Sequence, residues 1–118
     1  MVEITTSTNE GVHLLSVSGE VDASSSIHLD NAVRSAMDEG HKKIMIDCGG
    51  LNYISSAGLG VFMSYLEDFK TQEINFVVFG LQEKVLHVFQ LIGLENLLKI
   101  VSTKDEAEAY LNDSQAQS

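Results

Sequence analysis

The sequence predicts an α/β fold, a small mixed sheet of four to five strands packed with about four helices. Two observations predict it. Short apolar runs typical of buried strands alternate with stretches of helical apolar spacing, and the first two strands follow each other without a helix. With 118 residues, 44% of them apolar, the chain has material for one core. We therefore expect a single domain over residues 1–112 and a disordered polar tail over residues 113–118.

The chain begins with a predicted hairpin. Residues 2–7 are rich in β-branched side chains, and residues 11–19 alternate in part between apolar and polar. Asn9-Glu10-Gly11 between them is typical of a turn. These two strands are expected to be antiparallel neighbours.

The middle of the chain predicts two units in which a helix precedes a buried strand. The first helix covers residues 23–39, with possible N-caps in Ser24 to Ser26, and the strand over residues 43–47 is broken by Gly49-Gly50. The second helix covers residues 57–71, and its strand covers residues 74–79. Its expected inward face consists of Leu59, Phe62, Met63, Leu66 and Phe69.

The remaining elements are a third helix over residues 82–92, a weaker strand over residues 97–101 and a terminal helix. Thr103 and Glu106 fit a capping box at the start of that last helix. Strands separated by helices in this order predict parallel pairing through right-handed crossovers.

Charge and composition exclude several classes of function. Seventeen acidic against seven basic side chains give a formal charge of −10, which repels nucleic acid and anionic lipid. No apolar run approaches the roughly 20 residues that span a bilayer, and no basic segment precedes an apolar one at the N-terminus. We expect a cytoplasmic protein without nucleic-acid or membrane partners, and a monomer.

Cysteine and histidine usage gives no sign of a metal or cofactor site. Cys48 is alone, so no internal disulfide can form. His13, His28, His41 and His87 are scattered without zinc-ligand spacing, and we expect surface or half-buried imidazoles. No metal and no cofactor are therefore predicted.

The most informative segment joins the strand after residue 43 to the second helix. Ser55 or Ser56 stands where an N-cap is expected, and Gly58 and Gly60 occupy the first turns. Each glycine costs a helix roughly 1 kcal/mol relative to alanine, so something must offset that penalty.

Two interpretations of this segment stay open. In the structural one, Ser56 caps the helix and the glycines allow close packing against a strand. In the functional one, the glycines clear the surface around an exposed serine so that another protein's active site can reach its hydroxyl. A phosphate added there would be tolerated by the positive end of the helix dipole.

Catalysis is not predicted. Gly58-Leu59-Gly60 lacks the third glycine of a dinucleotide fingerprint and the lysine of a P-loop. Ser55-Ser56-Ala57-Gly58 is not a nucleophile elbow, and no histidine has the context of a general base. The chain is expected to be a binding module, not an enzyme.

The run from Tyr53 to Phe62 (YISSAGLGVF), the earlier Gly19-Glu20-Val21-Asp22-Ala23 and the order of elements resemble the STAS domain of bacterial anti-sigma factor antagonists. The resemblance implies a phosphoprotein that binds an anti-sigma factor, often itself a serine kinase, and so regulates sigma-factor-dependent transcription. Phosphorylation by this partner drives the antagonist off, and a metal-dependent serine phosphatase restores the active form.

The resemblance also assigns residues. The family motif Asp-Ser-Ser/Thr-Gly-Leu-Gly, aligned on Gly58 and Gly60, places the phosphate acceptor on Ser56, with Ser55 as a lesser candidate. Ser55 stands where the family usually has aspartate, and Ala57 where it usually has a second hydroxyl. The expected partner-binding residues are Asp22, Ser55, Ser56, Ala57, Gly58, Gly60 and Val61. Asp22 has an equally open structural interpretation, as a carboxylate favoured at a helix start.

An alternative function is consistent with the same fold. STAS domains without a working phosphorylation site occur in anion transporters and lipid-transport complexes. A constitutive scaffold subunit without switching therefore stays open.

Overall fold

The computed structural model describes the backbone of residues 1–117 and the side chains of residues 1–113. The strands are β1 (Val2–Asn9), β2 (Val12–Val21), β3 (Lys43–Ile54), β4 (Asn75–Phe79) and β5 (Lys99–Val101). The α-helices are α1 (Ser26–Asp38), α2 (Ser56–Thr71), α3 (Glu83–Leu91) and α4 (Lys104–Gln117). A short 3-10 helix, η1 (Leu94–Asn96), precedes β5.

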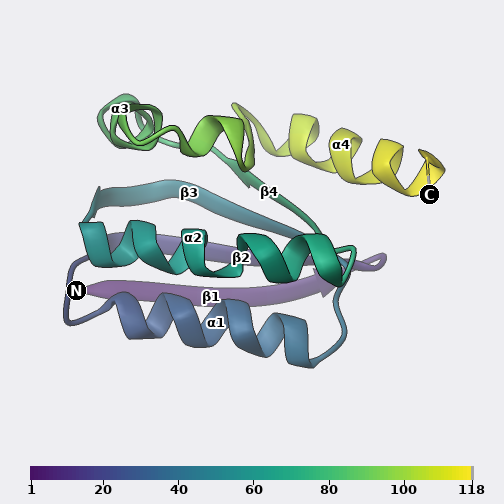
Figure 1. The fold of residues 1–118 in the computed structure, drawn as a ribbon, viewed down its shortest axis with the longest axis horizontal. Coiled ribbons are helices and arrows are strands. Elements are labelled where there is room, and N and C mark those ends of the chain that lie inside the picture. Colours follow the sequence, from purple (N-terminus) through teal and green to yellow (C-terminus); the bar gives the residue numbers. More distant parts are fainter. Residues whose placement is uncertain (118) are drawn as a thin grey trace.

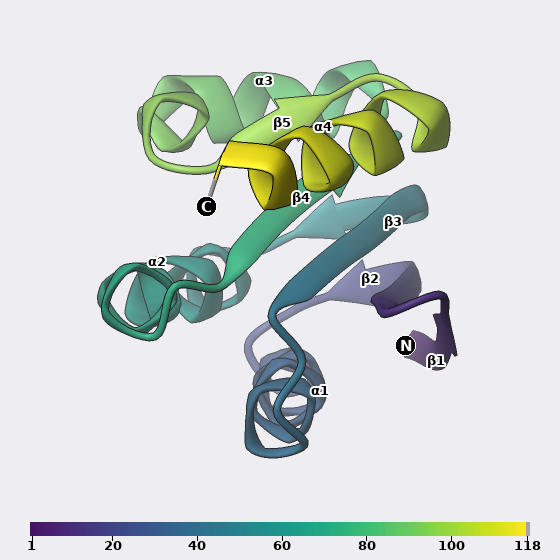
Figure 2. The same ribbon diagram turned by 90° about the vertical axis from the view of Figure 1, so that its right-hand side faces the viewer.

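The strands form one mixed sheet in the order β1-β2-β3-β4-β5. β1 is antiparallel to β2, and every later neighbour is parallel. Helices α1, α2 and α3 pack on one face of the sheet and α4 on the other (Figure 1, Figure 2). The predicted fold class, a small mixed sheet with about four helices, is confirmed. The order β2-β3-β4-β5 agrees with crossovers of one hand, which carry α1, α2 and α3 to the same face.

Two apolar cores follow from this arrangement. On the three-helix face, Ile44 and Ile46 of β3 pack with Phe62 of α2 and Phe89 of α3. The rings of Phe62 and Phe89 lie 5.6 Å apart. On the other face, Ala107 and Leu111 of α4 form a smaller core with alternate residues of β3 and β4. Alternation along the strands therefore divides the apolar residues between the two faces.

Strand β3 is longer than predicted. The expected break at Gly49-Gly50 is wrong, since the strand continues to Ile54. Its pairing with β2 shifts register near these glycines, and a Cβ at Gly50 would lie 2.7 Å from Ser18 Cβ. The glycine pair thus allows β2 and β3 to approach closely at an irregularity instead of ending the strand.

The inward face of α2 also differs from the prediction at two positions. Met63 is 48% exposed, whereas Tyr65 is buried. The Tyr65 hydroxyl donates to the Asp30 carboxylate of α1, and the Arg34 guanidinium lies 5.6 Å from the centre of the tyrosine ring. Burial is the main cause that raises the pKa of Tyr65, and the bond to Asp30 adds to it. Tyr65 can therefore be buried against α1 because its hydroxyl finds a hydrogen-bond partner there.

The C-terminal helix begins as predicted. Thr103 Oγ1 accepts from the Glu106 N–H at 3.2 Å, and Glu106 Oε1 accepts from the Thr103 N–H at 3.1 Å, which completes the capping box. The disordered tail expected over residues 113–118 stays a prediction, and Ser118 lies outside the described residues. Within residues 1–117 no helix is long and apolar enough to span a membrane.

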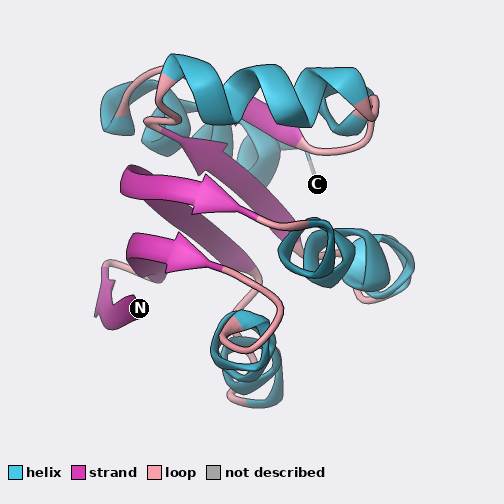
Figure 3. Cartoon of the chain, turned by 90° about the vertical axis from the view of Figure 1, so that its left-hand side faces the viewer, coloured by secondary structure: helices cyan, strands magenta, loops and turns pink. Residues whose placement is uncertain are grey.

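The parallel strands all end at the same edge of the sheet, where loops lead into the helices. Figure 3 looks onto this edge. A hydrogen bond of 2.8 Å from the Ser55 N–H to the Val21 carbonyl joins the end of β3 to the end of β2. The two segments singled out in the sequence therefore lie next to each other.

Candidate functional site

Ser55 is the N-cap of α2. It has an extended backbone, with φ −86° and ψ 172°, and its Oγ accepts a hydrogen bond of 3.2 Å from the Gly58 N–H. The structural interpretation that gave this role to Ser56 is wrong by one residue. Because the Ser55 N–H is held by Val21, the helical conformation begins only at the next residue.

Ser56 is the first helical residue of α2, and its side chain is exposed. Its hydroxyl has no hydrogen-bond partner among the side chains that the structure describes. Ala57 beside it is exposed as well. Of the two candidate acceptors, Ser55 is half-buried with an engaged hydroxyl, and Ser56 presents a free one to solvent.

Gly58 is required by packing. A Cβ at this position would lie 2.7 Å from Ile54 Cγ1 and 2.7 Å from Val21 Cγ1. The first turn of α2 therefore rests directly on the ends of β2 and β3. Here the expectation of close packing is met, and this packing offsets the glycine penalty.

Gly60 has no such explanation inside the chain. A Cβ there would meet nothing within 4 Å. Val61 next to it is half-buried and packs against the three-helix core, so it contributes less free surface than expected. Ser56 and Ala57 are thus the exposed small residues in the first turn of α2, and half-buried Gly60 follows one turn later. Two larger side chains are also exposed nearby, Tyr53 near the end of β3 and Met63 further along α2.

Asp22 organises the neighbouring loop between β2 and α1. Its Oδ1 accepts from the backbone N–H and the hydroxyl of both Ser24 and Ser25, at 2.8–3.0 Å. The Ser25 hydroxyl is also 3.1 Å from the Glu20 carbonyl. This network delays the start of α1 to Ser26, three residues after the predicted start.

The same hydrogen bonds control the charge of Asp22. Donation by the Ser24 hydroxyl, then by the Ser25 hydroxyl, lowers the pKa of this carboxyl to about 2. Asp22 is therefore ionised at any physiological pH. Ser25 is the N-cap residue of α1, within the predicted range Ser24 to Ser26. Sequence reasoning missed its bond to Asp22, although a serine three residues after an aspartate at a strand end is a usable signal for such a turn.

The site offers no metal centre among the side chains of residues 1–113, where no group of three or more His, Cys, Asp or Glu side chains could hold an ion. Its chemistry is that of a hydroxyl at a helix start. Successive backbone N–H groups and the positive end of the helix dipole favour an anion at such a position.

Comparison with known proteins identifies similar chains. A family model for the STAS domain matches residues 3–107. The anti-sigma-B factor antagonist of Listeria monocytogenes is 27% identical over 90 residues, covering 76% of this chain and 79% of that protein. An anti-sigma factor antagonist structure from Mycobacterium paratuberculosis has a TM-score of 0.87 at 21% identity, covering 95% of each chain. The phosphorylated form of the Bacillus cell fate determinant SpoIIAA has a TM-score of 0.69 at 16% identity, covering 92% of this chain and 98% of that one.

The two glycines are expected to respond oppositely to alanine. Gly58→Ala should lower the free energy of unfolding by about 1–3 kcal/mol, because the new methyl group overlaps Ile54 and Val21. Gly60→Ala should raise it by up to about 1 kcal/mol, because helix propensity improves in open space. Urea denaturation at neutral pH measures both, and equal effects would contradict the packing argument.

The two serines are expected to differ in stability as well. Ser55→Ala removes the hydroxyl that accepts from the Gly58 N–H and should cost about 1 kcal/mol of unfolding free energy. Ser56→Ala removes an unpaired hydroxyl and should change it by less than about 0.5 kcal/mol. Thermal denaturation of the matched pair tests this, and a larger loss for Ser56→Ala would return the capping role to Ser56.

Proposed function

The chain belongs to the STAS domain family, and on that premise we propose that it is an anti-sigma factor antagonist controlled by phosphorylation of Ser56. It acts in the cytoplasm as a binding module without enzymatic activity. The observation that carries the proposal is the exposed, unpaired hydroxyl of Ser56 beside the engaged hydroxyl of Ser55.

The relatives support the choice of partner. Similar proteins are named as anti-sigma-B factor antagonists, and one similar structure holds its protein in a phosphorylated form. The proposed partner is accordingly an anti-sigma factor that is also a serine kinase. Binding of the unmodified chain to this partner frees a sigma factor, and a metal-dependent serine phosphatase reverses the modification.

The physical basis of the switch is local. Phosphorylation adds about −1.5 to −2 charges at the first residue of α2, where the helix dipole tolerates an anion. A bound partner would have to desolvate or pair that charge, which can cost several kcal/mol. One phosphate can therefore reduce affinity about a hundredfold or more, since each factor of ten corresponds to about 1.4 kcal/mol.

Small side chains around Ser56 fit close contact with a partner. Gly60 lies one turn further along α2, and a Cβ there would meet nothing within 4 Å. Packing within the fold therefore does not explain why this position is a glycine. We assign the role of this glycine to the complex, in which a partner's backbone approaches the helix. Asp22, Ser55, Ala57, Gly58 and Val61 complete the proposed interface, with Gly58 and Val61 acting mainly by supporting the exposed residues.

The departures from the family motif alter charge more than shape. A serine hydroxyl at position 55 caps the helix, as an aspartate also could. The aspartate's negative charge beside the acceptor is missing, however, so the phosphate accounts for a larger part of the charge change. Ala57 cannot accept phosphate, which leaves Ser56 as the exposed acceptor in this turn.

Phosphorylation should map to Ser56. The unmodified chain is used to isolate its kinase from cells of the source organism, and is then incubated with that kinase and ATP. Peptide mass spectrometry should find phosphate on Ser56 in the native chain and in Ser55→Ala, and none in Ser56→Ala. Phosphate found on Ser55 would show that Ser55, not Ser56, is the acceptor. No phosphate on either serine would contradict the switch and favour a constitutive scaffold.

A charge at Ser56 should weaken partner binding without unfolding the domain. Ser56→Asp is expected to raise the Kd for the isolated anti-sigma factor at least tenfold, or about 1.4 kcal/mol, with little change in melting temperature. Ser7→Asp places the same charge on an exposed position of β1 and serves as the matched control. Calorimetry that finds equal affinities for the two variants would refute the assigned interface.

A further inference from the structure

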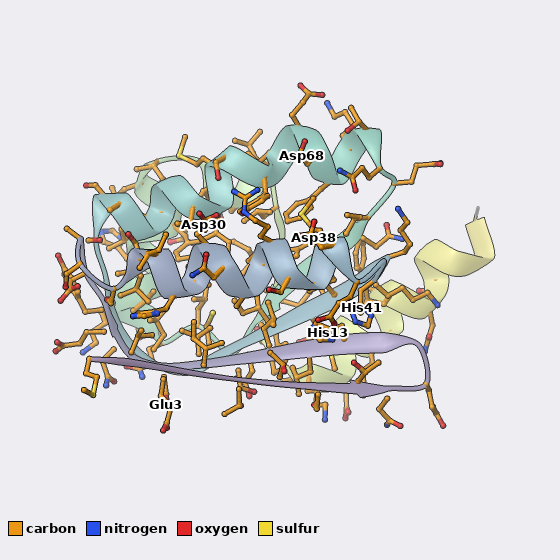
Figure 4. All side chains as sticks on the ribbon, turned by 90° about the horizontal axis from the view of Figure 1, so that it is seen from below. Glu3, His13, Asp30, Asp38, His41 and Asp68 are labelled. Carbon is orange, nitrogen blue, oxygen red and sulfur yellow. The ribbon has the colours of Figure 1, made fainter. Side chains whose placement is uncertain are left out.

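Two histidines stack near the amino ends of the parallel strands, at the opposite end of the sheet from Ser56. His13 begins the buried face of β2 and is only 5% exposed, contrary to the expectation of a surface or half-buried imidazole. His41 lies in the segment between α1 and β3. Their ring centres are 4.0 Å apart with an angle of 17° between the planes (Figure 4).

The stack joins three segments that are separate in the sequence. His13 Nδ1 lies 2.9 Å from the hydroxyl oxygen of Thr8, its cross-strand partner on β1. His41 Nε2 lies 3.2 Å from Oε1 of Glu39, the C-cap residue that follows α1. The contact therefore connects the β1–β2 hairpin to the end of α1 and to the segment that leads into β3.

One carboxylate faces the two rings. Among the described side chains, Glu39 is the acidic group within ion-pair distance of the stack. Lys42 donates to the Gln72 carbonyl at 3.0 Å and so points away from the stack. Lys43 precedes the inward-facing Ile44 on β3, and strand alternation directs it to the other face of the sheet.

His28 and Asp38 of α1 complete the set of nearby titratable groups. His28 is exposed and lines the same open groove between β1 and α1 as His13 and Glu39, one end of which reaches Val2. Asp38 is exposed on α1. Glu39 can thus compensate one added proton on the stack, but no second carboxylate among residues 1–113 lies within ion-pair distance to compensate another.

We propose that the His13–His41 stack is a pH-sensitive latch, closed while at most one ring carries a proton and released when both do. Two neutral or singly protonated rings stack without net repulsion, whereas two imidazolium ions 4.0 Å apart repel each other. Release frees the turn end of the β1–β2 hairpin from α1 and leaves the rest of the sheet in place. The latch is independent of the function proposed for Ser56.

The direction of the pH effect follows from burial. Burial lowers the pKa of His13 below 6.5, the nearby His41 lowers it further, and Glu39 partly opposes both. In the open state His13 is solvated and binds its proton with ordinary affinity. The closed state therefore keeps its full stability above about pH 6.5, and the closed-to-open ratio falls up to tenfold per pH unit below it for each extra proton bound.

Hydrogen exchange of the full chain between pH 7.5 and 5.0 tests the latch. Protection factors, corrected for intrinsic exchange, should fall at least fivefold in the β1–β2 turn region and stay unchanged in β3 and β4. His41→Phe keeps a stacked ring that cannot be protonated, so the fall should be at least threefold smaller. The NMR titration midpoint of His13 should rise in the same variant.

His28→Gln is the matched control, since it removes an exposed histidine of the same groove that is outside the stack. It should behave as the native chain does. The latch is overturned by an unchanged native protection at pH 5.0, by an equal fall in His41→Phe, or by an equal effect of His28→Gln. Loss of protection throughout the sheet would overturn it too, because that pattern is global unfolding.

Discussion

The arrangement around Ser55 and Ser56 depends on how α2 meets the ends of β2 and β3. The Ser55 N–H is bonded to the Val21 carbonyl, and Gly58 lies against Ile54 and Val21 with no room for a methyl group. These two contacts fix both the start and the direction of the helix. Ser55 becomes the cap, and the next residue is turned toward solvent. The accessibility of Ser56 is therefore a consequence of packing one turn away.

Most of the fold could be predicted from periodicity and turn residues, because those signals are local. The predictions that were wrong concern residues whose conformation or burial depends on a segment distant in the sequence. Gly49-Gly50 has the local pattern of a break, yet close approach to Ser18 keeps it within β3. Met63 and Tyr65 both fit the apolar spacing of α2, and the buried one, Tyr65, is the one that contacts Asp30 on α1. His13 is buried by the same kind of long-range contact.

The N-cap of α2 was predicted in the right turn of the chain, but the structural interpretation gave it to Ser56 and not to Ser55. Capping preferences cannot distinguish two adjacent serines at the start of a helix, because serine is a good N-cap at either position. Asp22 shows the same limit, because the sequence does not reveal that Ser24 and Ser25 donate to its carboxylate. Its role in partner binding stays a proposal. Hydrogen bonds between loops distinguish such residues, and a single sequence does not record them.

The net charge of the chain restricts how a phosphate at Ser56 can act. Phosphorylation changes the formal charge from −10 to about −12, a small change in a field that is already negative. At physiological ionic strength the Debye length is about 8 Å, so exposed charges further away than this are largely screened. Long-range repulsion can therefore contribute little to discrimination between the two forms. On the proposed function, discrimination between the two forms must come from partner groups in direct contact with the phosphate, and the open space at Gly60 leaves room for such groups.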